Sequence, residues 1–202
     1  MRILHYTLGF APYRSGGLTK YVTDLMIAQQ KLGHDVYCLY PGGYSFVRQH
    51  GYVHLDKSSF GLGVYEITNP MPVPLFYGTN EPDKLMDESN LDKKSFIRML
   101  EEVKPDVLHV HTLMGIPKAY LQIVHDKKIK IVYTSHDYFG LCLKVNLIDV
   151  NGKFCEKICV KNCEQCNRMG KSILFLRLRN AKWMVPFKPF IRKYLSSRNI
   201  KV

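Results

Sequence analysis

Two histidines and a pair of adjacent glycines are the residues whose types and positions could do chemistry in this chain. His111 follows the apolar stretch DVLHV, and His136 with Asp137 follows the stretch IKIVYTS. Gly16 and Gly17 come after the apolar stretch RILHYTL and a loop, directly before a helix pattern. A helix start without side chains exposes N–H groups that attract an anion or a sugar hydroxyl. The sequence therefore predicts a site for a polar ligand, with a plain turn as the alternative for the glycines.

Strand and helix patterns alternate along the chain and position these residues. Strands are predicted at residues 2–8, 35–41, 64–68, 106–112 and 129–135, and helices at 18–32, 91–103 and 116–128. The alternation implies parallel pairing, so the expected fold is α/β, a Rossmann-like doubly wound parallel sheet. Such sheets bind ligands outside the carboxyl ends of their strands, so we expect Gly16, His111 and His136 to line one crevice. His5 and His109 lie deeper in their strands and are interpreted as core histidines.

The remaining segments are less regular. Residues 69–82 are rich in proline and are expected to form a loop near the ligand. A hairpin is predicted over residues 147–154, on an Asn-Gly turn. The tail is expected to form a helix near 168–180, a strand at 182–187, a helix at 189–197 and a short strand at 200–202.

The glycine turn does not match a dinucleotide site. That site needs the pattern G-x-G-x-x-G directly after the first strand and an acidic residue at the end of the second strand. Six residues separate Gly9 from Gly16, and the second strand ends in CLYP. A dinucleotide is therefore not the expected ligand.

A cysteine-rich segment precedes the tail and is expected to form an insertion, residues 137–166, at the carboxyl edge of the sheet. Five of the six cysteines fall within 25 residues: Cys142, Cys155, Cys159, Cys163 and Cys166. Thiolates at this density predict a structural zinc bound by the last four, with Cys142 as the substitute ligand. Free thiols remain the alternative, and such a zinc would not be catalytic.

The positive charge of the chain is concentrated at its C-terminal end. The net charge is +12, and residues 167–202 hold ten Lys or Arg and no Asp or Glu. Because aromatic and aliphatic residues are interleaved there, we predict peripheral contact with an anionic membrane surface, with a solvated basic face as the alternative. Nucleic acid is not favoured, since no nucleic-acid motif accompanies the charge. No signal peptide and no run of about 20 apolar residues is found, so we expect a cytoplasmic chain, at most peripheral at the inner membrane face.

Three segments of the chain together resemble a known family. They are MRILHYTLGFAPYRSGGLTKYVTDLMIAQQKLGHDVYCLYPG, then KPDVLHVHT, then YTSHDYF. In this order and spacing they resemble the N-terminal domain of GT-B fold glycosyltransferases, specifically the retaining group numbered family 4, over essentially the whole chain. The resemblance implies that the loop at Gly16 and Gly17 lies against the donor phosphate and the acceptor. It also implies that His111 contacts the transferred sugar as the catalytic residue, and that His136 and Asp137 line the acceptor side.

The resemblance also implies a partner that residues 1–202 lack. Similar enzymes hold the nucleotide-sugar donor mainly in a second Rossmann-like C-terminal domain. We therefore expect residues 1–202 to form a single acceptor-recognising domain, whether excised, a natural fragment or half of a split enzyme, and to be inactive alone. The implied reaction transfers a sugar to a glycan or lipid-linked acceptor, in envelope polysaccharide synthesis, without a catalytic metal.

A non-catalytic function stays open as the alternative. The same features fit a zinc-stapled, Rossmann-like binding module for a polyanion or a protein partner. The two functions differ in what would saturate the site: a lipid-linked saccharide at the strand ends, or a polyanion on the tail with steep salt dependence.

Overall fold

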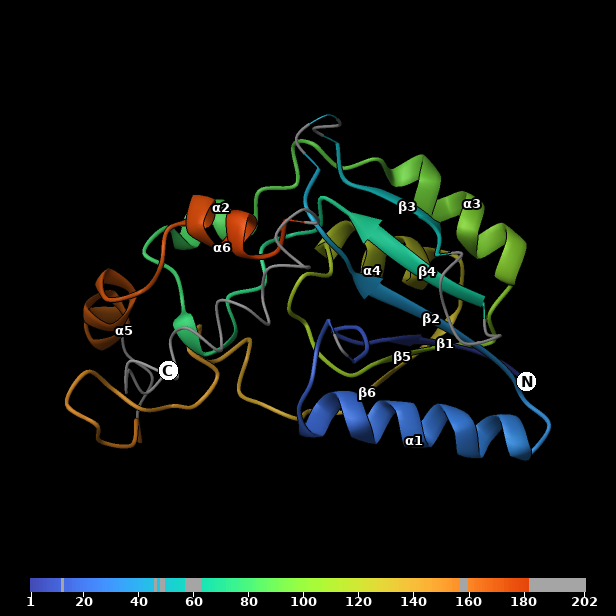
Figure 1. The fold of residues 1–202 in the computed structure, drawn as a ribbon, viewed down its shortest axis with the longest axis horizontal. Helices are drawn as coiled ribbons and strands as arrows, with labels where there is room; N and C mark the ends of the chain where they lie inside the picture. The colour runs from blue at the N-terminus through green and yellow to red at the C-terminus, as the bar shows by residue number, and fades with distance from the viewer. Residues whose placement is uncertain (12, 46, 48–49, 57–62, 157–159, 182–202) are drawn as a thin grey trace, which may run out of the picture.

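One six-stranded sheet forms the centre of the computed structural model, which describes residues 1–11, 13–45, 47, 50–56, 63–156 and 160–181 (Figure 1). The strands are β1 (Arg2–Tyr6), β2 (Asp35–Pro41), β3 (Tyr52–Leu55), β4 (Gly63–Thr68), β5 (Val107–Val110) and β6 (Lys130–Tyr133). Their order is β3-β4-β2-β1-β5-β6. Neighbouring strands are parallel except β3, which runs antiparallel to β4.

Helices α1 (Gly17–Lys31), α3 (Lys93–Val103) and α4 (Lys118–Asp126) cover the faces of this sheet. The other helices of the described chain are α2 (Pro82–Leu85), α5 (Val160–Arg168) and α6 (Ile173–Arg179), with a 3-10 turn η1 (Leu75–Tyr77). In Figure 1, α1 lies on one face of the sheet, and α3 and α4 lie on the other. The expected α/β, Rossmann-like doubly wound sheet is therefore confirmed. The strand order turns back between β1 and β5, and in such folds ligands bind at the carboxyl ends of the strands at that point.

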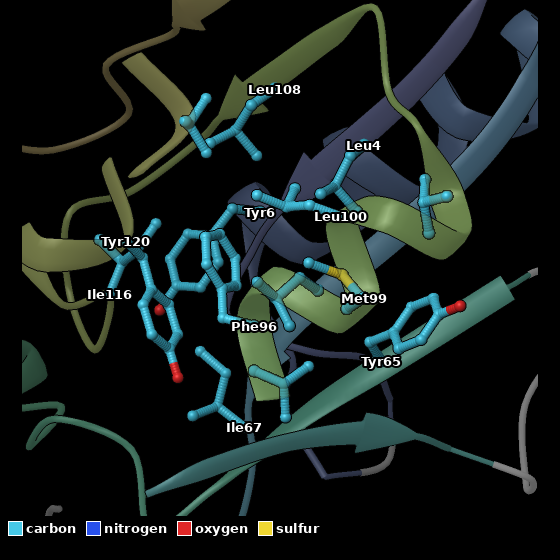
Figure 2. Packing of buried hydrophobic residues seen from close by; sticks show 14 of the residues in the cluster. Leu4, Tyr6, Tyr65, Ile67, Phe96, Met99, Leu100, Leu108, Ile116 and Tyr120 are labelled. Carbon is cyan, nitrogen blue, oxygen red and sulfur yellow. The ribbon is translucent and has the colours of Figure 1, made fainter. Parts of the chain in front are cut away.

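The face under α3 and α4 is an apolar core. Phe96 of α3 and Tyr120 of α4 stack with their ring centroids 3.9 Å apart (Figure 2). Leu4 of β1 and Leu108 of β5 are fully buried in the same cluster. Its other buried members are Tyr6, Leu39, Val53, Tyr65, Ile67, Met99, Leu100, Val103, Val110, Ile116 and Val124. Burial of this much apolar surface is the main stabilising contribution to such a domain.

The face under α1 has a smaller apolar cluster. Val22 and Met26 of α1 are buried against Val36 and Cys38 of β2 and Val64 of β4. Because successive side chains of a strand point to opposite faces, each central strand supplies both layers. Toward β1 and β5 this face changes from apolar residues to histidines.

Glycines define both ends of α1. Gly16, the N-cap, has φ 135°, a conformation that residues with a side chain rarely adopt. Gly33 has φ 82° just after the helix. The N–H of Gly33 donates to Gln30 O at 2.9 Å and that of His34 to Gln29 O at 3.1 Å, the bonding of a Schellman motif. The predicted helix end at Gly33 is confirmed.

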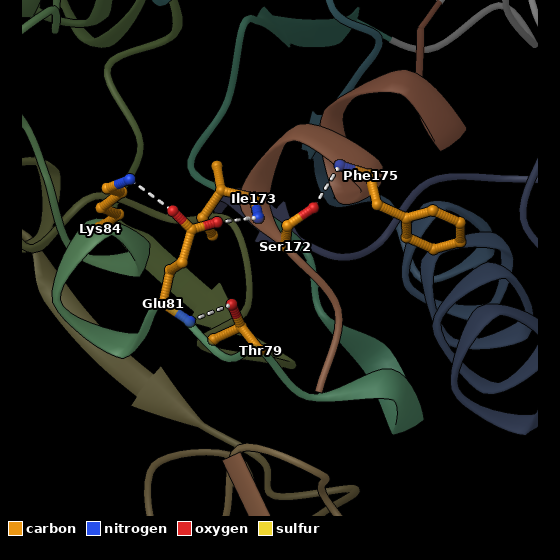
Figure 3. A network of polar contacts seen from close by, with 6 residues as sticks. All are labelled: Thr79, Glu81, Lys84, Ser172, Ile173 and Phe175. Atoms are coloured by element: carbon orange, nitrogen blue, oxygen red, sulfur yellow. Dashed lines mark hydrogen bonds and ion pairs between the residues drawn. The ribbon is translucent and has the colours of Figure 1, made fainter. Parts of the chain in front are cut away.

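A small second layer, formed by α2 and α6, lies beside the carboxyl edge of the sheet. The carboxylate of Glu81 accepts a hydrogen bond from the backbone N–H of Ile173 at 2.8 Å and pairs with Lys84 (Figure 3). Ser172 caps α6 by accepting from the N–H of Phe175 at 3.2 Å. The buried apolar side chains of this layer are Leu85 of α2 and Ile173 and Leu176 of α6.

The structure differs from the sequence prediction in residues 42–82. Strand β3 is absent from the predicted strands, because its four residues show no alternation of apolar and polar side chains. The segment 69–82, expected as a loop without an element, contains η1. Pro74 precedes that turn with φ −73°, which suits a helical start.

The elements predicted at residues 147–154 and 168–180 differ from the structure in extent, and the insertion predicted at 137–166 stays a prediction. The hairpin predicted at 147–154 is reduced to one bridge between Ile148 and Phe154. The helix predicted near 168–180 is formed by α6, and α5 precedes it. The strands and helix predicted at 182–202 lie outside the described residues. None of the helices in the described part of the chain is both long and apolar enough to span a bilayer.

Candidate functional site

Four histidines meet near the carboxyl ends of β1, β5 and β6. His5 of β1 is in register with His109 of β5, and their ring centroids are 5.3 Å apart. His111 is the first residue after β5. Its ring centroid lies 4.0 Å from that of His109 and 5.6 Å from that of His136. Strand alternation places His109 and His111 on the same face as His5, the face that α1 covers. His5 and His111 are fully buried, and His136 is exposed.

A chain of hydrogen bonds runs from α1 through two of these rings. Nε2 of His5 lies 2.7 Å from Oε1 of Gln29, and Nδ1 of His5 lies 3.0 Å from Nε2 of His111. Because an amide oxygen only accepts, His5 carries its proton on Nε2. Its Nδ1 then accepts from the Nε2–H of His111. This leaves Nδ1 of His111 unprotonated, facing Nε2 of His136 at 3.4 Å.

The buried imidazoles are neutral at physiological pH. Burial lowers the pKa of His5 to about 4, an effect that the hydrogen bond to Gln29 opposes and the nearby His109 adds to. Burial lowers the pKa of His111 to about 3, and the neighbouring imidazoles lower it further. Burial and the proximity of His136 also lower the pKa of His109. These groups can therefore accept hydrogen bonds without carrying charge.

The start of α1 adjoins the exposed end of this chain. The ring of Tyr21 lies 4.8 Å from that of His136 and 6.0 Å from that of His111. Tyr21 is about one turn after Gly17. A Cβ atom added at Gly16 or Gly17 would meet no atom within 4 Å, so the backbone there borders open space. The site thus combines the imidazoles of His111 and His136, the phenol of Tyr21 and the backbone N–H groups at the start of α1.

A polar groove of about 290 Å³ lies beside the carboxyl ends of β2 and β4. Its lining includes Tyr44, Asn69, Glu88 and Arg177 of α6. The guanidinium of Arg177 lies 5.8 Å from the centre of the Tyr44 ring, and the Tyr44 hydroxyl donates to Pro70 O at 2.8 Å. Such a mixture of aromatic and charged groups suits a sugar or a phosphate.

The loop before the glycines is tied to the end of α6. Arg14 is 8% exposed, and its Nη2 donates to Oδ1 of Asn180 at 3.0 Å. Its guanidinium lies 5.1 Å from the ring centre of Tyr13. Burial lowers the pKa of Arg14, but a guanidinium keeps its charge over the whole physiological range. The loop therefore brings a buried positive charge close to the start of α1.

The structure brings some of the predicted residues together and separates others from them. His111 and His136 are in contact, and Gly16 and Gly17 begin the helix that contacts both. Oδ1 of Asp137 accepts from the N–H of Phe139 at 2.8 Å, so this carboxylate stabilises a local turn.

The predicted zinc ligands are only partly described. Three of the four predicted ligands are partly buried: Cys155, Cys163 and Cys166. The proposed substitute ligand, Cys142, is also partly buried, and Cys159 lies outside the described residues. Among the residues that the structure describes, the group of three ligating atoms that lie close together belongs to histidines instead. Zinc binding by the cysteines therefore stays a prediction.

Sequence reasoning separated His5 from the site and did not identify Gln29 or Tyr21. The structure confirms that His5 is a buried, hydrogen-bonded histidine, yet its partner is His111 itself. One feature of the sequence could have identified Gln29. It is a polar residue at the helical spacing of Val22 and Met26, on the buried stripe of α1.

Comparison with known proteins gives one family match. The profile described as Glycosyltransferase Family 4 matches residues 15–148, more than half of the chain. No curated protein gives a significant match. The family match supports a glycosyltransferase-type domain with a saccharide-type acceptor, and it does not favour the non-catalytic binding module.

Proposed function

Because the chain belongs to glycosyltransferase family 4, we propose that it is the acceptor-recognising domain of an enzyme that transfers a sugar from a nucleotide-sugar donor to a glycan or lipid-linked acceptor. Envelope polysaccharide synthesis is the process that we propose for this reaction. The observation that carries the proposal is the contact between His111 and His136 at the carboxyl edge of the sheet, beside the open start of α1.

His111 is proposed to receive the transferred sugar. The hydrogen bonds from Gln29 through His5 leave Nδ1 of His111 unprotonated on the side of His136. A sugar hydroxyl that takes the place of His136 at this nitrogen can donate to it, and the neutral ring adds no positive charge beside an oxocarbenium-like transition state. His136 and Tyr21, both exposed, would contact the acceptor side.

The start of α1 is proposed to face the donor diphosphate. The first N–H groups of a fifteen-residue helix point out of Gly17 and its neighbours, and the dipole of the helix favours an anion there. The open space at Gly16 and Gly17 lets a diphosphate come within hydrogen-bonding distance of the backbone. No metal is needed for this contact.

The groove at Tyr44 and Arg177 is the proposed acceptor subsite. Arg177 can pair with a phosphate of a lipid-linked acceptor, and Tyr44 offers an aromatic wall for a sugar ring. The predicted contact of the basic tail with a membrane would place such an acceptor near this groove. It stays a prediction, because most of that tail lies outside the described residues.

The donor is proposed to be held mainly by a second, C-terminal domain. In the transfer step the acceptor oxygen bonds to the anomeric carbon as the bond to the nucleoside diphosphate breaks, and the leaving diphosphate takes the hydroxyl proton. We propose retention of configuration at that carbon. Because the cations that stabilise the leaving group would belong to the second domain, the isolated chain is proposed to be inactive.

A structural zinc is proposed for the cysteine-rich segment, with Cys155, Cys159, Cys163 and Cys166 as ligands. The support is that Cys155 has other thiols as neighbours. Burial first, and then the proximity of Asp149, Cys166, Cys142 and Cys163, raises the pKa of its thiol. One zinc per chain that is lost in a Cys166→Ser variant would support this ligand set.

Acceptor binding is the direct test of the proposed function. Ligand-observed NMR on the 202-residue chain would use mannose, galactose and N-acetylglucosamine oligosaccharides and a short-chain polyprenyl diphosphate sugar. We expect at least one probe to bind and a His136→Ala variant to weaken it about tenfold or more, a loss of about 1.4 kcal/mol. His136 is exposed, so this change should leave the fold intact.

A matched control comes from another exposed histidine. His125→Ala, at the end of α4, should leave binding unchanged. Absence of binding by every probe, or equal affinities of the His136→Ala and His125→Ala variants, would contradict the proposed acceptor site.

A further inference from the structure

Three imidazoles from two neighbouring strands converge beneath α1. One ring nitrogen of each of His5, His109 and His111 lies within 4.8 Å of the corresponding atoms of the other two. Nδ1 of His5 and Nε2 of His111 are 3.0 Å apart. Nitrogens bound to one tetrahedral zinc ion are about 3.3 Å apart, given a Zn–N distance of about 2.0–2.1 Å. This pair therefore already has nearly the separation of two ligands of one ion.

The outer nitrogen of each of these rings has its own hydrogen-bond partner. Metal-binding histidines typically use the ring nitrogen that does not bind the metal in this way, which fixes the orientation of the ring. The three pairs are His5 Nε2 with Gln29 Oε1 at 2.7 Å, His109 Nε2 with Thr134 Oγ1 at 2.8 Å, and His111 Nδ1 with His136 Nε2 at 3.4 Å. The other nitrogens of His5 and His111 face each other at 3.0 Å, and a ring nitrogen of His109 lies within 4.8 Å of ring nitrogens of both.

We propose that His5, His109 and His111 bind one divalent transition metal ion of the zinc type. The ligand atoms would be Nδ1 of His5, Nδ1 of His109 and Nε2 of His111. Imidazole nitrogens suit zinc, copper and nickel, and three protein ligands leave one tetrahedral position for water or a ligand hydroxyl. This site is separate from the cysteine-rich segment. It shares His111 with the proposed sugar contact, and because an ion at Nε2 leaves Nδ1 of His111 protonated, metal binding and that sugar contact are alternative states of this residue.

Metal binding requires protons to change position in two rings. Without metal, His111 carries its proton on Nε2 and donates it to His5, while Nδ1 of His111 accepts from the Nε2–H of His136. With an ion at Nε2 of His111, the His111 proton moves to Nδ1 and donates to Nε2 of His136, whose own proton moves to its Nδ1. The number of bound protons stays the same.

The cluster is approachable from the side of β6. His109 is only half-buried. Its register partner Val132 is 36% exposed, although it lies on the sheet face that α1 covers. His109 is therefore the member of the cluster that borders solvent, next to Val132.

A metal titration that separates the two candidate centres would test this proposal. The 202-residue chain carrying Cys155→Ser and Cys166→Ser would be stripped with a chelator and titrated with Co²⁺ and then Zn²⁺ by calorimetry and absorption. We expect one ion per chain and cobalt d–d bands without a sulfur-to-cobalt charge-transfer band. X-ray absorption of the unsubstituted, zinc-loaded chain should also show nitrogen neighbours at about 2.0–2.1 Å in addition to sulfur at about 2.3 Å.

Two histidine variants in the same cysteine background complete the test. His109→Gln should weaken cobalt binding at least tenfold, while the exposed His125→Gln should leave it unchanged. Circular dichroism would confirm that both variants are folded. Absence of binding in the cysteine background, or equal affinities of folded His109→Gln and His125→Gln variants, would overturn the proposal. The readout is metal binding alone, so a failure of the acceptor experiment would not affect it.

Discussion

The two faces of the central sheet are built from the same strands but differ in chemistry. Leu4 and Leu108 point toward α3 and α4, into a cluster whose buried members are all apolar or aromatic. One residue further along each strand, His5 and His109 point toward α1, where hydrogen bonds replace much of the apolar packing. A side-chain repeat of two residues therefore allows one strand to serve stability on one face and ligand chemistry on the other.

This difference indicates where the domain tolerates polar groups. A buried polar group is costly unless it is hydrogen-bonded, and each imidazole of the α1 face has a partner. Substitutions on the apolar face should therefore change stability alone. Substitutions on the α1 face should change stability in a pH-dependent way and should also change binding.

Phe96→Ala should have the largest effect. Removing a buried ring that stacks on Tyr120 leaves a cavity in the apolar face, and we expect the free energy of unfolding to fall by about 3–5 kcal/mol. Urea denaturation would measure this loss. Ile27→Ala, at an exposed position of α1, is the control and should stay within about 0.5 kcal/mol of the parent. Similar losses for both variants would contradict the assignment of the main core to the α3 and α4 side.

Acidification should have the second largest effect, and it should act on the α1 face. The pKa values of His5 and His111 are about 4 and about 3 in the folded chain, below the ordinary value of 6.5. As the pH falls from 6.5 to 4, the unfolded chain binds protons that the folded chain does not. The free energy of unfolding therefore decreases over this range, and the contribution of these groups is fully present above pH 6.5.

The wild-type chain and a His5→Gln variant should differ in this pH dependence. Urea denaturation at a series of pH values would give both slopes, and the variant should have the shallower one. Carboxylates contribute equally to both chains and cancel in the comparison. Parallel slopes would show that His5 is not a buried neutral imidazole.

Gln29→Ala should have an intermediate effect. It removes the acceptor for the buried Nε2–H of His5, and an unsatisfied buried donor costs about 1–3 kcal/mol. Gln30→Ala, at the exposed neighbouring position, should be close to neutral because alanine favours the helix. Thermal and urea unfolding of the pair would isolate the hydrogen bond from helix propensity. A neutral Gln29→Ala would remove the basis for the proton positions assigned to His5 and His111.

Gly16→Ala should have the smallest effect. Its φ of 135° is unfavourable for alanine, although no atom would clash with the new Cβ, so we expect a loss of about 1 kcal/mol. Gly17→Ala adds the same methyl group one residue later, inside the helix, where no positive φ is required. It should be neutral or slightly stabilising. Acceptor binding measured on both variants would show whether open space or backbone conformation is what the ligand needs.

The sheet could be predicted from the sequence because its signals are local. The runs at β1, β2, β4, β5 and β6 are apolar and bounded by turn residues, and α1 has both its apolar stripe and its terminal glycines. The edge strand β3 could not be found in this way, because its antiparallel pairing with β4 depends on a neighbour rather than on its own pattern.

The candidate site was predictable only in outline. That His111 and His136 follow strands can be read along the chain, and parallel pairing brings strand ends together. The contact of His5 with His111 joins residues 106 positions apart and requires the register between β1 and β5. Gln29 requires, in addition, the rotation of α1 over the sheet. Pairwise geometry of this kind has no local signature, so His5 and His111 appeared to be unrelated.

One short connection joins the groove to the C-terminal end of the described chain. The N–H of Tyr44 donates to the carbonyl of Asn180 at 3.3 Å, and Tyr44 forms a bridge with Ala181. Tyr44 and Arg177 are at the same time part of the groove lining. A displacement of Asn180 and Ala181 would therefore also move Tyr44 in the groove lining. A ligand bound in the groove would in turn restrain the positions of Asn180 and Ala181.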